Sequence, residues 1–171
     1  MPNHCHNRVT FYSDNKEKEI QELHDIFSIN VEDQNEERRI FGQFIPEPDW
    51  KNTPLTEDDV KQYSHSEPRG KIGEYPVMVE HENSFYAGLR FSSTNDPDNR
   101  WYDWRLSHWD TKWDCYDLDI DDSNLPYGFE VSFNTAWAPP ESICRAVREK
   151  YPDIDVSWFY DKPGEEFAGY L

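Results

Sequence analysis

The sequence predicts an α+β fold, in which an antiparallel β-sheet is covered by helices on one face. Four short segments alternate apolar and polar residues with the two-residue period of β-strands. Two other segments repeat apolar residues at helical spacing. Each expected strand has one clearly apolar face, which suits a sheet whose helices lie on one side. The 171 residues are expected to form a single domain with one hydrophobic core.

The N-terminal residues predict a strand and then a helix. Residues 6–12 alternate apolar and polar side chains, as a half-buried strand does. Asp14 and Glu17 are three residues apart, which is the spacing of a capping box at a helix start. Apolar residues then recur at helical spacing, and the helix is expected to end near residues 29–32.

A long insertion is expected at about residues 33–112. Its prolines forbid long regular elements. The short elements predicted within it are a strand over Ile40–Ile45, a capped helix over Glu57–Tyr63, a strand or a helix over Pro76–His81, an element of either kind over Asn83–Phe91, and a helix over Trp101–Trp109. Asp110–Lys112 is expected to end the last of these, and Trp113 to enter the next strand.

The C-terminal part predicts two strands, a helix and two further strands. Residues 116–121, 129–134 and 154–160 each alternate apolar with acidic or other polar side chains. A proline pair precedes the helix expected between the second and third of these segments. Asp161–Gly164 has proline and glycine where a type II turn favours them, and residues 167–171 are expected to return as a final strand.

Without the insertion, the predicted order is βαββαβ followed by an extra C-terminal strand. This is the order of the ferredoxin-like fold, an antiparallel sheet with two helices on one face. The ferredoxin-like core is therefore expected at about residues 4–32 and 113–171.

The composition is acidic and aromatic. The chain has 35 acidic and 17 basic residues, a net charge of −18, and aromatic residues make up 16% of it. A surface of this charge repels phosphate backbones, so direct binding of nucleic acid is not expected. The same surface suits a basic protein, including one that itself holds nucleic acid, although acidity also serves solubility alone.

Cysteine usage and hydropathy indicate the compartment. The three cysteines are far apart and lack metal-ligand spacing, so neither a disulfide framework nor a zinc knuckle is expected. No apolar run approaches the roughly 20 residues that a membrane span needs, and the N-terminus lacks the apolar region of a signal peptide. The chain is therefore expected to be cytoplasmic, with no membrane partner.

Four motifs carry a resemblance: the opening MPNHCHN, the block WYDWRLSHWDTKWD, the motif FNTAWAPP and the ending WFYDKPGEEFAGY. They resemble the YubB-like or Api92-like proteins of plasmids and phages. The resemblance covers the N-terminal strand and most of residues 99–171, and it implies a ferredoxin-like domain and a bacterial host cell. It implies no agreed activity and no catalytic residues. Asp110 stands where a glycine is usual in that family, and His108 where an asparagine is usual.

The segment Asn99–Tyr116 holds four of the chain's seven tryptophans. Trp, Tyr and Arg dominate the energetics of protein interfaces, so this segment is a candidate binding surface. Because aliphatic residues are sparse, the rings are also expected to pack onto the sheet. A combination of both is natural, with Trp101 and Trp104 packed inward and polar neighbours at an exposed rim.

Metal and catalytic patterns are weak. His4 and His6 share one face of an extended segment, but no further zinc ligand is identifiable. The aspartates of 117–122 resemble a calcium loop, yet the required glycine and glutamate positions hold other residues. Ser107 beside His108 is adjacency only, because neighbours on a helix do not face each other. No cofactor, metal or catalytic residue is therefore expected.

The sequence favours a non-enzymatic acidic binding protein of a phage or plasmid. It is expected to inhibit or modulate a basic host protein that handles nucleic acid or serves defence, for instance as a DNA mimic or an anti-CRISPR protein. Two alternatives stay open: a small metal-dependent enzyme acting on a nucleotide or nucleic acid, and an assembly protein that forms homo-oligomers through its last strand. The acids are expected on the sheet face away from the helices. The residues expected to contact the partner are Trp101, Tyr102, Trp104, Arg105, Trp109, Lys112, Trp113, Asp117, Asp119, Asp121, Glu130 and Asp155.

Overall fold

The computed structural model describes residues 3–29, 39–50, 53, 76–78, 89–91 and 100–171. The chain divides into two compact units, of which the first consists of Met1–Pro46 and Trp104–Leu171 and the second of Glu47–Asp103. The expected organisation, a single domain with a core at 4–32 and 113–171 and an insertion at 33–112, stays a prediction.

The first unit contains an antiparallel sheet whose described strands follow the order β4-β5-β1-β6-β7. Along the chain its main elements run β1-α1-β4-β5-α4-β6-β7, which is the predicted βαββαβ order with an added last strand. The predicted fold class is thus confirmed. The elements are β1 His4–Tyr12, α1 Glu17–Phe27, β4 Tyr116–Asp121, β5 Gly128–Ala136, α4 Glu141–Lys150, β6 Asp155–Lys162 and β7 Phe167–Tyr170.

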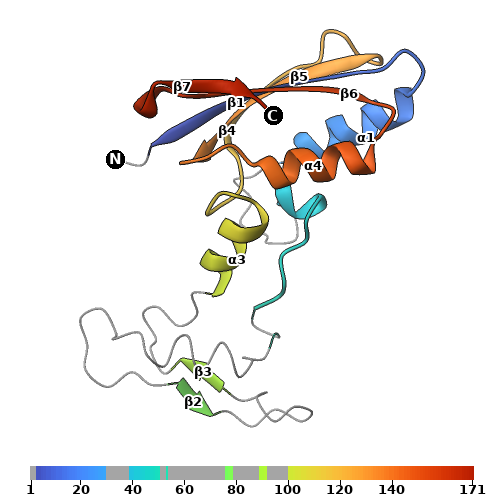
Figure 1. The fold of residues 1–171 in the computed structure, drawn as a ribbon. Coiled ribbons are helices and arrows are strands. Elements are labelled where there is room, and N and C mark those ends of the chain that lie inside the picture. Colours follow the sequence, from blue (N-terminus) through green and yellow to red (C-terminus); the bar gives the residue numbers. More distant parts are fainter. Residues whose placement is uncertain (1–2, 30–38, 51–52, 54–75, 79–88, 92–99) are drawn as a thin grey trace. The chain divides into compact units, whose positions relative to one another are not determined.

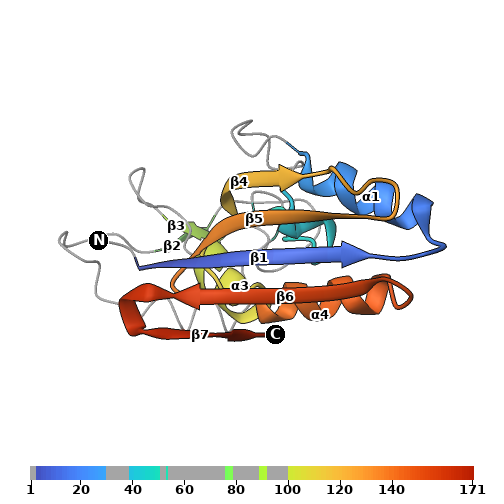
Figure 2. The same cartoon turned by 90° about the horizontal axis from the view of Figure 1, so that it is seen from above.

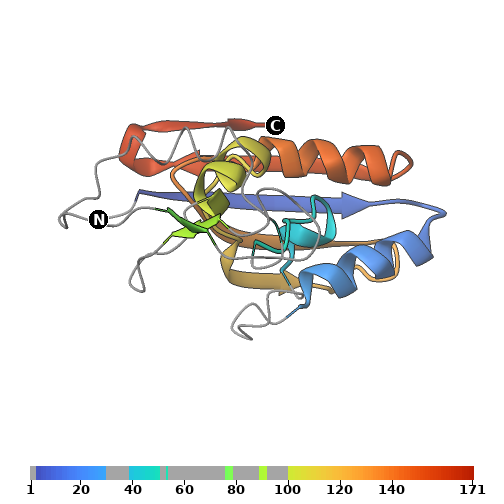
Figure 3. The same cartoon turned by 90° about the horizontal axis from the view of Figure 1, so that it is seen from below.

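Both α1 and α4 lie on the same face of this sheet (Figure 1). Figure 3 shows the two helices in front of the strands, whereas Figure 2 shows the strands in front of the helices. Strand β1 explains this one-sided cover, because its residues alternate strictly between exposed and buried. The core fills the space between sheet and helices, and its members include Val9, Phe11, Ile20, Leu23, Phe27, Val131, Phe133, Ile143, Val147 and Trp158.

The capping box expected at the start of α1 is wrong. The helix begins at Glu17 with Lys16 as its N-cap residue, and the Lys16 side chain makes no capping hydrogen bond. Asp14 instead accepts a hydrogen bond from the Tyr12 hydroxyl at the end of β1. Lys16 Nζ lies 2.9 Å from Asp153 Oδ2. These two contacts hold the segment between β1 and α1, so the helix begins later in the chain than expected. It also ends earlier than expected, at Phe27.

The strand expected over Ile40–Ile45 is also wrong, because this segment contains the 3-10 helix η2, Phe41–Gln43. Side chains bind the backbone groups that a strand would pair. Asp114 Oδ1 accepts the backbone N–H of Phe41 at 3.2 Å, and the Ile45 carbonyl accepts the indole N–H of Trp109 at 2.9 Å. Phe41 is fully buried, so this segment packs into the hydrophobic core instead of extending the sheet.

The type II turn expected after β6 is replaced by a second 3-10 helix, η3, Pro163–Glu165. Pro163 occupies its first turn, where a fixed φ angle and a missing N–H are tolerated. Lys162 Nζ lies 2.6 Å from Glu165 Oε2 across this turn. The left-handed residue is Glu166, with φ of 53°, which directs the chain into β7.

In the second unit, β2 Pro76–Met78 pairs antiparallel with β3 Leu89–Phe91. The first part of Pro76–His81 is therefore a strand, whereas the helix expected over Glu57–Tyr63 lies outside the described residues. Arg100 is buried in this unit. One of its guanidinium nitrogens donates to the Thr53 and Trp50 carbonyls at 2.8 and 3.2 Å, and the guanidinium lies 5.1 Å from the centre of the Trp50 ring.

Helix α3, Arg100–His108, confirms the predicted helix over Trp101–Trp109 to within one residue. Asp110 then adopts φ of 63°, a left-handed conformation that glycine favours. Its Oδ2 accepts the Ser142 backbone N–H at 2.7 Å, so the aspartate also satisfies the first turn of α4. The strand expected to start at Trp113 starts at Tyr116. None of the helices in the described part of the chain has the length and apolar character that a membrane crossing requires.

Candidate functional site

The sheet face opposite α1 and α4, which we name the open face, is covered by neither helix (Figure 2). Register aligns its side chains in rows that cross β6, β1, β5 and β4 in that order. Three such rows are Asp161–His6–Asn134–Tyr116, Phe159–Arg8–Ser132–Asp119 and Ser157–Thr10–Glu130–Asp121.

Carboxylates lie on both sides of the open face, with Arg8 near its middle. Asp119 and Asp121 are exposed on β4, and Glu130 is half-buried beside them on β5. Asp155 is exposed at the start of β6, on the other side of β1. The structure therefore places these four expected contact residues on one face, where acids outnumber the bases.

Local hydrogen bonds hold two of these acids in place. Asp121 accepts the Ser123 backbone N–H at 3.0 Å, and the hydrogen bonds from Ser123 lower the pKa of this carboxyl below its usual value. The Thr10 hydroxyl donates to Glu130 Oε2 at 3.2 Å across the strands. Asp121 is therefore ionised at neutral pH and available to attract a cation.

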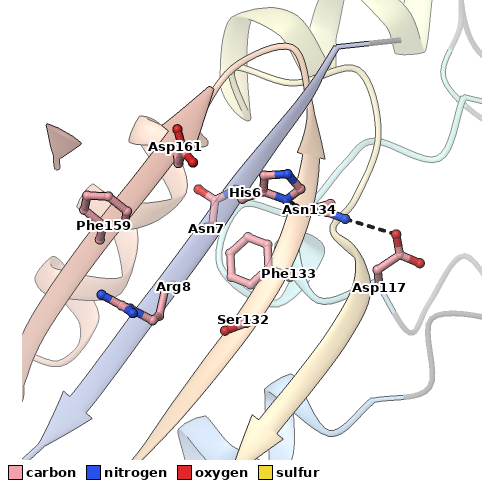
Figure 4. A pocket seen from close by; sticks show the side chains of 9 residues that line it. All are labelled: His6, Asn7, Arg8, Asp117, Ser132, Phe133, Asn134, Phe159 and Asp161. Carbon is pink, nitrogen blue, oxygen red and sulfur yellow. Dashed lines mark hydrogen bonds between the residues drawn. The ribbon is translucent and has the colours of Figure 1, made fainter. Parts of the chain in front are cut away.

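A hollow of about 290 Å³ opens on this face where the first two rows meet (Figure 4). His6 and Asn134 are hydrogen-bonded across β1 and β5, and Asn134 Nδ2 donates to Asp117 Oδ2 at 3.0 Å. Asp117 reaches this position because the pairing of β4 with β5 shifts between Tyr116 and Asp119, and because its own φ is 53°. The bulge thus brings one further carboxylate to the edge of the hollow.

The opposite side of the hollow is formed by β6 and β1. The guanidinium of Arg8 lies 5.5 Å from the centre of the Phe159 ring, a cation–π distance. Asp161 lies one row away, directly across from His6. The hollow therefore has a carboxylate at each end, on β4 and on β6, and an arginine stacked on an aromatic ring at its wall.

The tryptophan segment is divided between the core and the surface. Trp109 is fully buried, and its ring lies edge-on to Phe41 and Trp104 at centroid distances of 5.9 and 5.7 Å. Trp104 is half-buried and stacks on His108 at 4.3 Å. Trp101 is half-buried in the second unit. The inward packing expected of this segment is therefore provided chiefly by Trp109.

The other expected contact residues of this segment are partly exposed. Tyr102 is 41% exposed and Trp113 is 37% exposed. Lys112 Nζ lies 4.0 Å from the centre of the Trp113 ring, and the Arg105 guanidinium lies 5.3 Å from that of Trp109. Arg105, Lys112 and Trp113 are not on the strands that form the rows of the open face, and Tyr102 belongs to the second unit.

The histidine pair of the N-terminus makes hydrogen bonds instead of sharing a ligand set. His4 Nδ1 bonds the Tyr116 hydroxyl, and His6 Nδ1 bonds Asn134. Among the described residues, no group of three or more His, Cys, Asp and Glu side chains has the arrangement of a metal site.

Ser107 and His108 do approach each other, contrary to the expectation from helical spacing. Ser107 Oγ lies 2.8 Å from His108 Nδ1. Both groups also lie within 2.9 Å of the Trp104 carbonyl oxygen at the end of α3. This arrangement satisfies the end of a helix, and both side chains are exposed.

Sequence reasoning did not assign to the binding surface the residues that shape the hollow, namely His6, Arg8, Asn134, Phe159 and Asp161. Each occupies a position facing away from the core in an alternating strand, and this alternation was the available signal. Their grouping depends on strand register, which brings His6 beside Asn134 from 128 residues away.

Comparison with known proteins defines the class of this domain. Residues 108–171 match the model of a family described as the ferredoxin-like domain in Api92-like protein. This part of the chain has the ferredoxin-like fold, and it is similar to the domain that this family model describes in Api92-like proteins. Among solved structures, the crystal structure of the protein Api92 from Yersinia pseudotuberculosis is similar over 99% of this chain and 93% of its own, with a TM-score of 0.47 and 10% identity. None of the curated proteins matches the chain in sequence.

Proposed function

We propose that the protein is a non-enzymatic binding protein that engages a basic partner protein through its open face. One observation carries this proposal: carboxylates on β4, β5 and β6 gather on a sheet face that neither α1 nor α4 covers. Acids on a strand are expected wherever the strand faces water. Solvent exposure alone does not require that they gather on one broad face. In a chain with a net charge of −18, this gathering creates a field that attracts cations.

The electrostatics favour a protein over a nucleic acid as partner. A phosphate backbone meets repulsion from Asp119, Asp121 and Glu130, and Arg8 alone among the three rows supplies a fixed positive charge. A surface rich in Lys and Arg meets complementary charge along β4, which raises the association rate and sets the orientation of the complex.

More specifically, we propose that this is a phage or plasmid protein that acts in the cytoplasm of a bacterial host. The partner is a host protein that handles nucleic acid or serves defence, and the acidic face occupies the surface on which that protein holds nucleic acid. The net charge of −18 and the placement of the carboxylates support this form. The exposed aromatic residues Tyr102 and Trp113 stay candidates for further contacts with the partner.

A charge-matched pair of triple variants tests the proposal. The open-face variant carries D119N, D121N and E130Q, and the control carries E17Q, E141Q and E149Q on α1 and α4. Binding of a fluorescent arginine-rich peptide is measured by anisotropy at about 50 mM and about 300 mM salt. We expect the open-face variant to lose at least about tenfold in affinity and the control less than about threefold, with the difference reduced at the higher salt.

Equal losses in the two triple variants would reject the open face as the binding surface. Circular dichroism of each variant checks that the fold is retained.

A further inference from the structure

The hollow on the open face suggests the form in which a basic partner is recognised. We infer that it receives an extended segment of the partner that crosses the strands and places two cationic side chains four residues apart, one at Asp161 and one at Asp117. This inference rests on the proposed function and specifies its partner chemistry.

The first step of the argument is distance. Asp161 is on β6 and Asp117 is on β4, so β1 and β5 lie between them, and the two carboxylates are three strand spacings apart. With about 4.8 Å between neighbouring strands, this separation is about 14 Å. An extended peptide advances about 3.4 Å per residue, so residues i and i+4 lie about 13 to 14 Å apart and their side chains point the same way.

The second step is the wall between the two carboxylates. His6 and Asn134 lie between them, and Arg8 lies one row away, stacked at 5.5 Å on Phe159 (Figure 4). Its positive charge repels a cation at the middle of the segment, whereas the ring and the backbone of the sheet accept a neutral residue. The hollow of about 290 Å³ has room for short side chains there. The site therefore selects a pattern in which two cations flank a neutral stretch.

The third step is preorganisation. Asn134 donates to Asp117 Oδ2 at 3.0 Å and is itself hydrogen-bonded to His6, so this carboxylate is held before a partner arrives. A held acceptor loses less conformational freedom when a guanidinium binds than a free surface carboxylate does. Arginine, whose planar group donates to a carboxylate in a fixed geometry, is favoured at this end.

Two peptides of identical composition test the inference on the full chain. Each contains two arginines in a Gly/Ser background, four residues apart in one peptide and two apart in the other. We expect the first to bind about fivefold more tightly by calorimetry at low salt, because it engages both carboxylates at once. D117N and D161N should each abolish this preference, and Asn tolerates the left-handed backbone at position 117. The control E149Q, on α4, should retain it.

The outcomes separate this inference from the proposed function. Equal binding of the two peptides would overturn the spacing rule and leave the basic partner in place. Binding of neither peptide would overturn both. Tighter binding of a single-stranded RNA than of either peptide would also overturn both, since Arg8 and Phe159 would then hold a phosphate and a base instead of flanking a cationic segment.

Discussion

The two faces of the sheet in the first unit are built from the same strands and have opposite properties. In β1, Phe11 is fully buried against the helices, and its neighbour Thr10 is exposed on the open face. On the helix side, Phe11 lies 4.9 Å from Phe129 and 5.5 Å from Phe27, centre to centre. The helix side is therefore fixed by packing, which leaves the open face free to carry charge.

Polar groups on the two faces also differ in what satisfies their hydrogen bonds. Asn7 points into the core, where it donates to Thr135 Oγ1 at 3.0 Å and accepts the Trp158 indole N–H at 3.1 Å. A buried polar group must find partners of this kind, because an unpaired one costs free energy. The acids of the open face have no such requirement, since water solvates them. The comparison yields five predictions, which follow from the largest expected effect to the smallest.

The largest effect is expected from truncating a core ring. F11A removes a fully buried side chain that touches two other rings, and we expect it to lower the free energy of unfolding by about 3–5 kcal/mol. The matched change on the other face, T10A, should alter it by less than about 1 kcal/mol, the net worth of its hydrogen bond to Glu130. Urea unfolding followed by circular dichroism measures both, and comparable losses would contradict the distinction between the faces.

The next effect concerns a carboxylate on the helix side. Asp114 Oδ1 accepts the backbone N–H groups of Phe41 and Cys115 at 3.2 and 2.8 Å. D114A leaves these donors without their acceptor, and we expect a loss of about 2 kcal/mol in the free energy of unfolding. D114N keeps an acceptor oxygen and should lose less. Urea unfolding at pH 7 distinguishes the two variants.

The same residue gives a pH dependence. Desolvation by burial raises the pKa of Asp114, despite the lowering effect of its backbone hydrogen bonds. A raised folded-state pKa means that the folded protein favours the protonated acid, so this contribution to stability is complete below the unfolded-state pKa. It is lost as pH rises through the folded-state pKa. D114N should therefore gain stability relative to the parent protein as pH rises from about 4. A difference that is independent of pH would contradict this assignment.

A smaller effect is expected at Asp110, which joins the end of α3 to the start of α4. D110A removes the acceptor of the Ser142 N–H, and it leaves in the left-handed region an alanine that has no polar side chain to support this backbone locally. We expect a loss of about 1–2 kcal/mol by thermal or urea unfolding. D110N keeps both an acceptor and tolerance of this backbone, so it should stay within about 0.5 kcal/mol of the parent protein. A loss as large as that of D110A would indicate that the charge, not the geometry, matters.

The sheet was predictable because its signal is local. The alternation around Val9 and Phe11 marks β1, and the same period marks β4, β5 and β6. Local signals failed where a distant side chain decides the backbone. Asp114 binds the Phe41 N–H from 73 residues away, and this contact turns an apolar segment that resembles a strand into a 3-10 helix.

The candidate site was predictable only in part, for the same reason. The exposed acids Asp119 and Asp121 follow from alternation within one strand. The hollow depends on register between strands and on the bulge that displaces Asp117, and neither property is encoded within a short window of sequence. His6 and Arg8 were visible as polar residues, but their neighbours across β5 and β6 were not.

The smallest change in stability is expected on the open face, and it is the most informative about function. Asp119 and Asp121 are exposed and lie two residues apart on the same face of β4, so their charges repel each other. The double variant D119N/D121N should therefore change the free energy of unfolding by less than about 0.5 kcal/mol, because relief of this repulsion, a gain, opposes the loss of the charge-assisted hydrogen bond from Ser123 to Asp121. Such a gain should vanish near 1 M salt, where the Debye length is about 3 Å. A loss above about 1 kcal/mol would mean that these acids hold the strand in place. They would then be structural groups, and the open face would not be free to bind a partner.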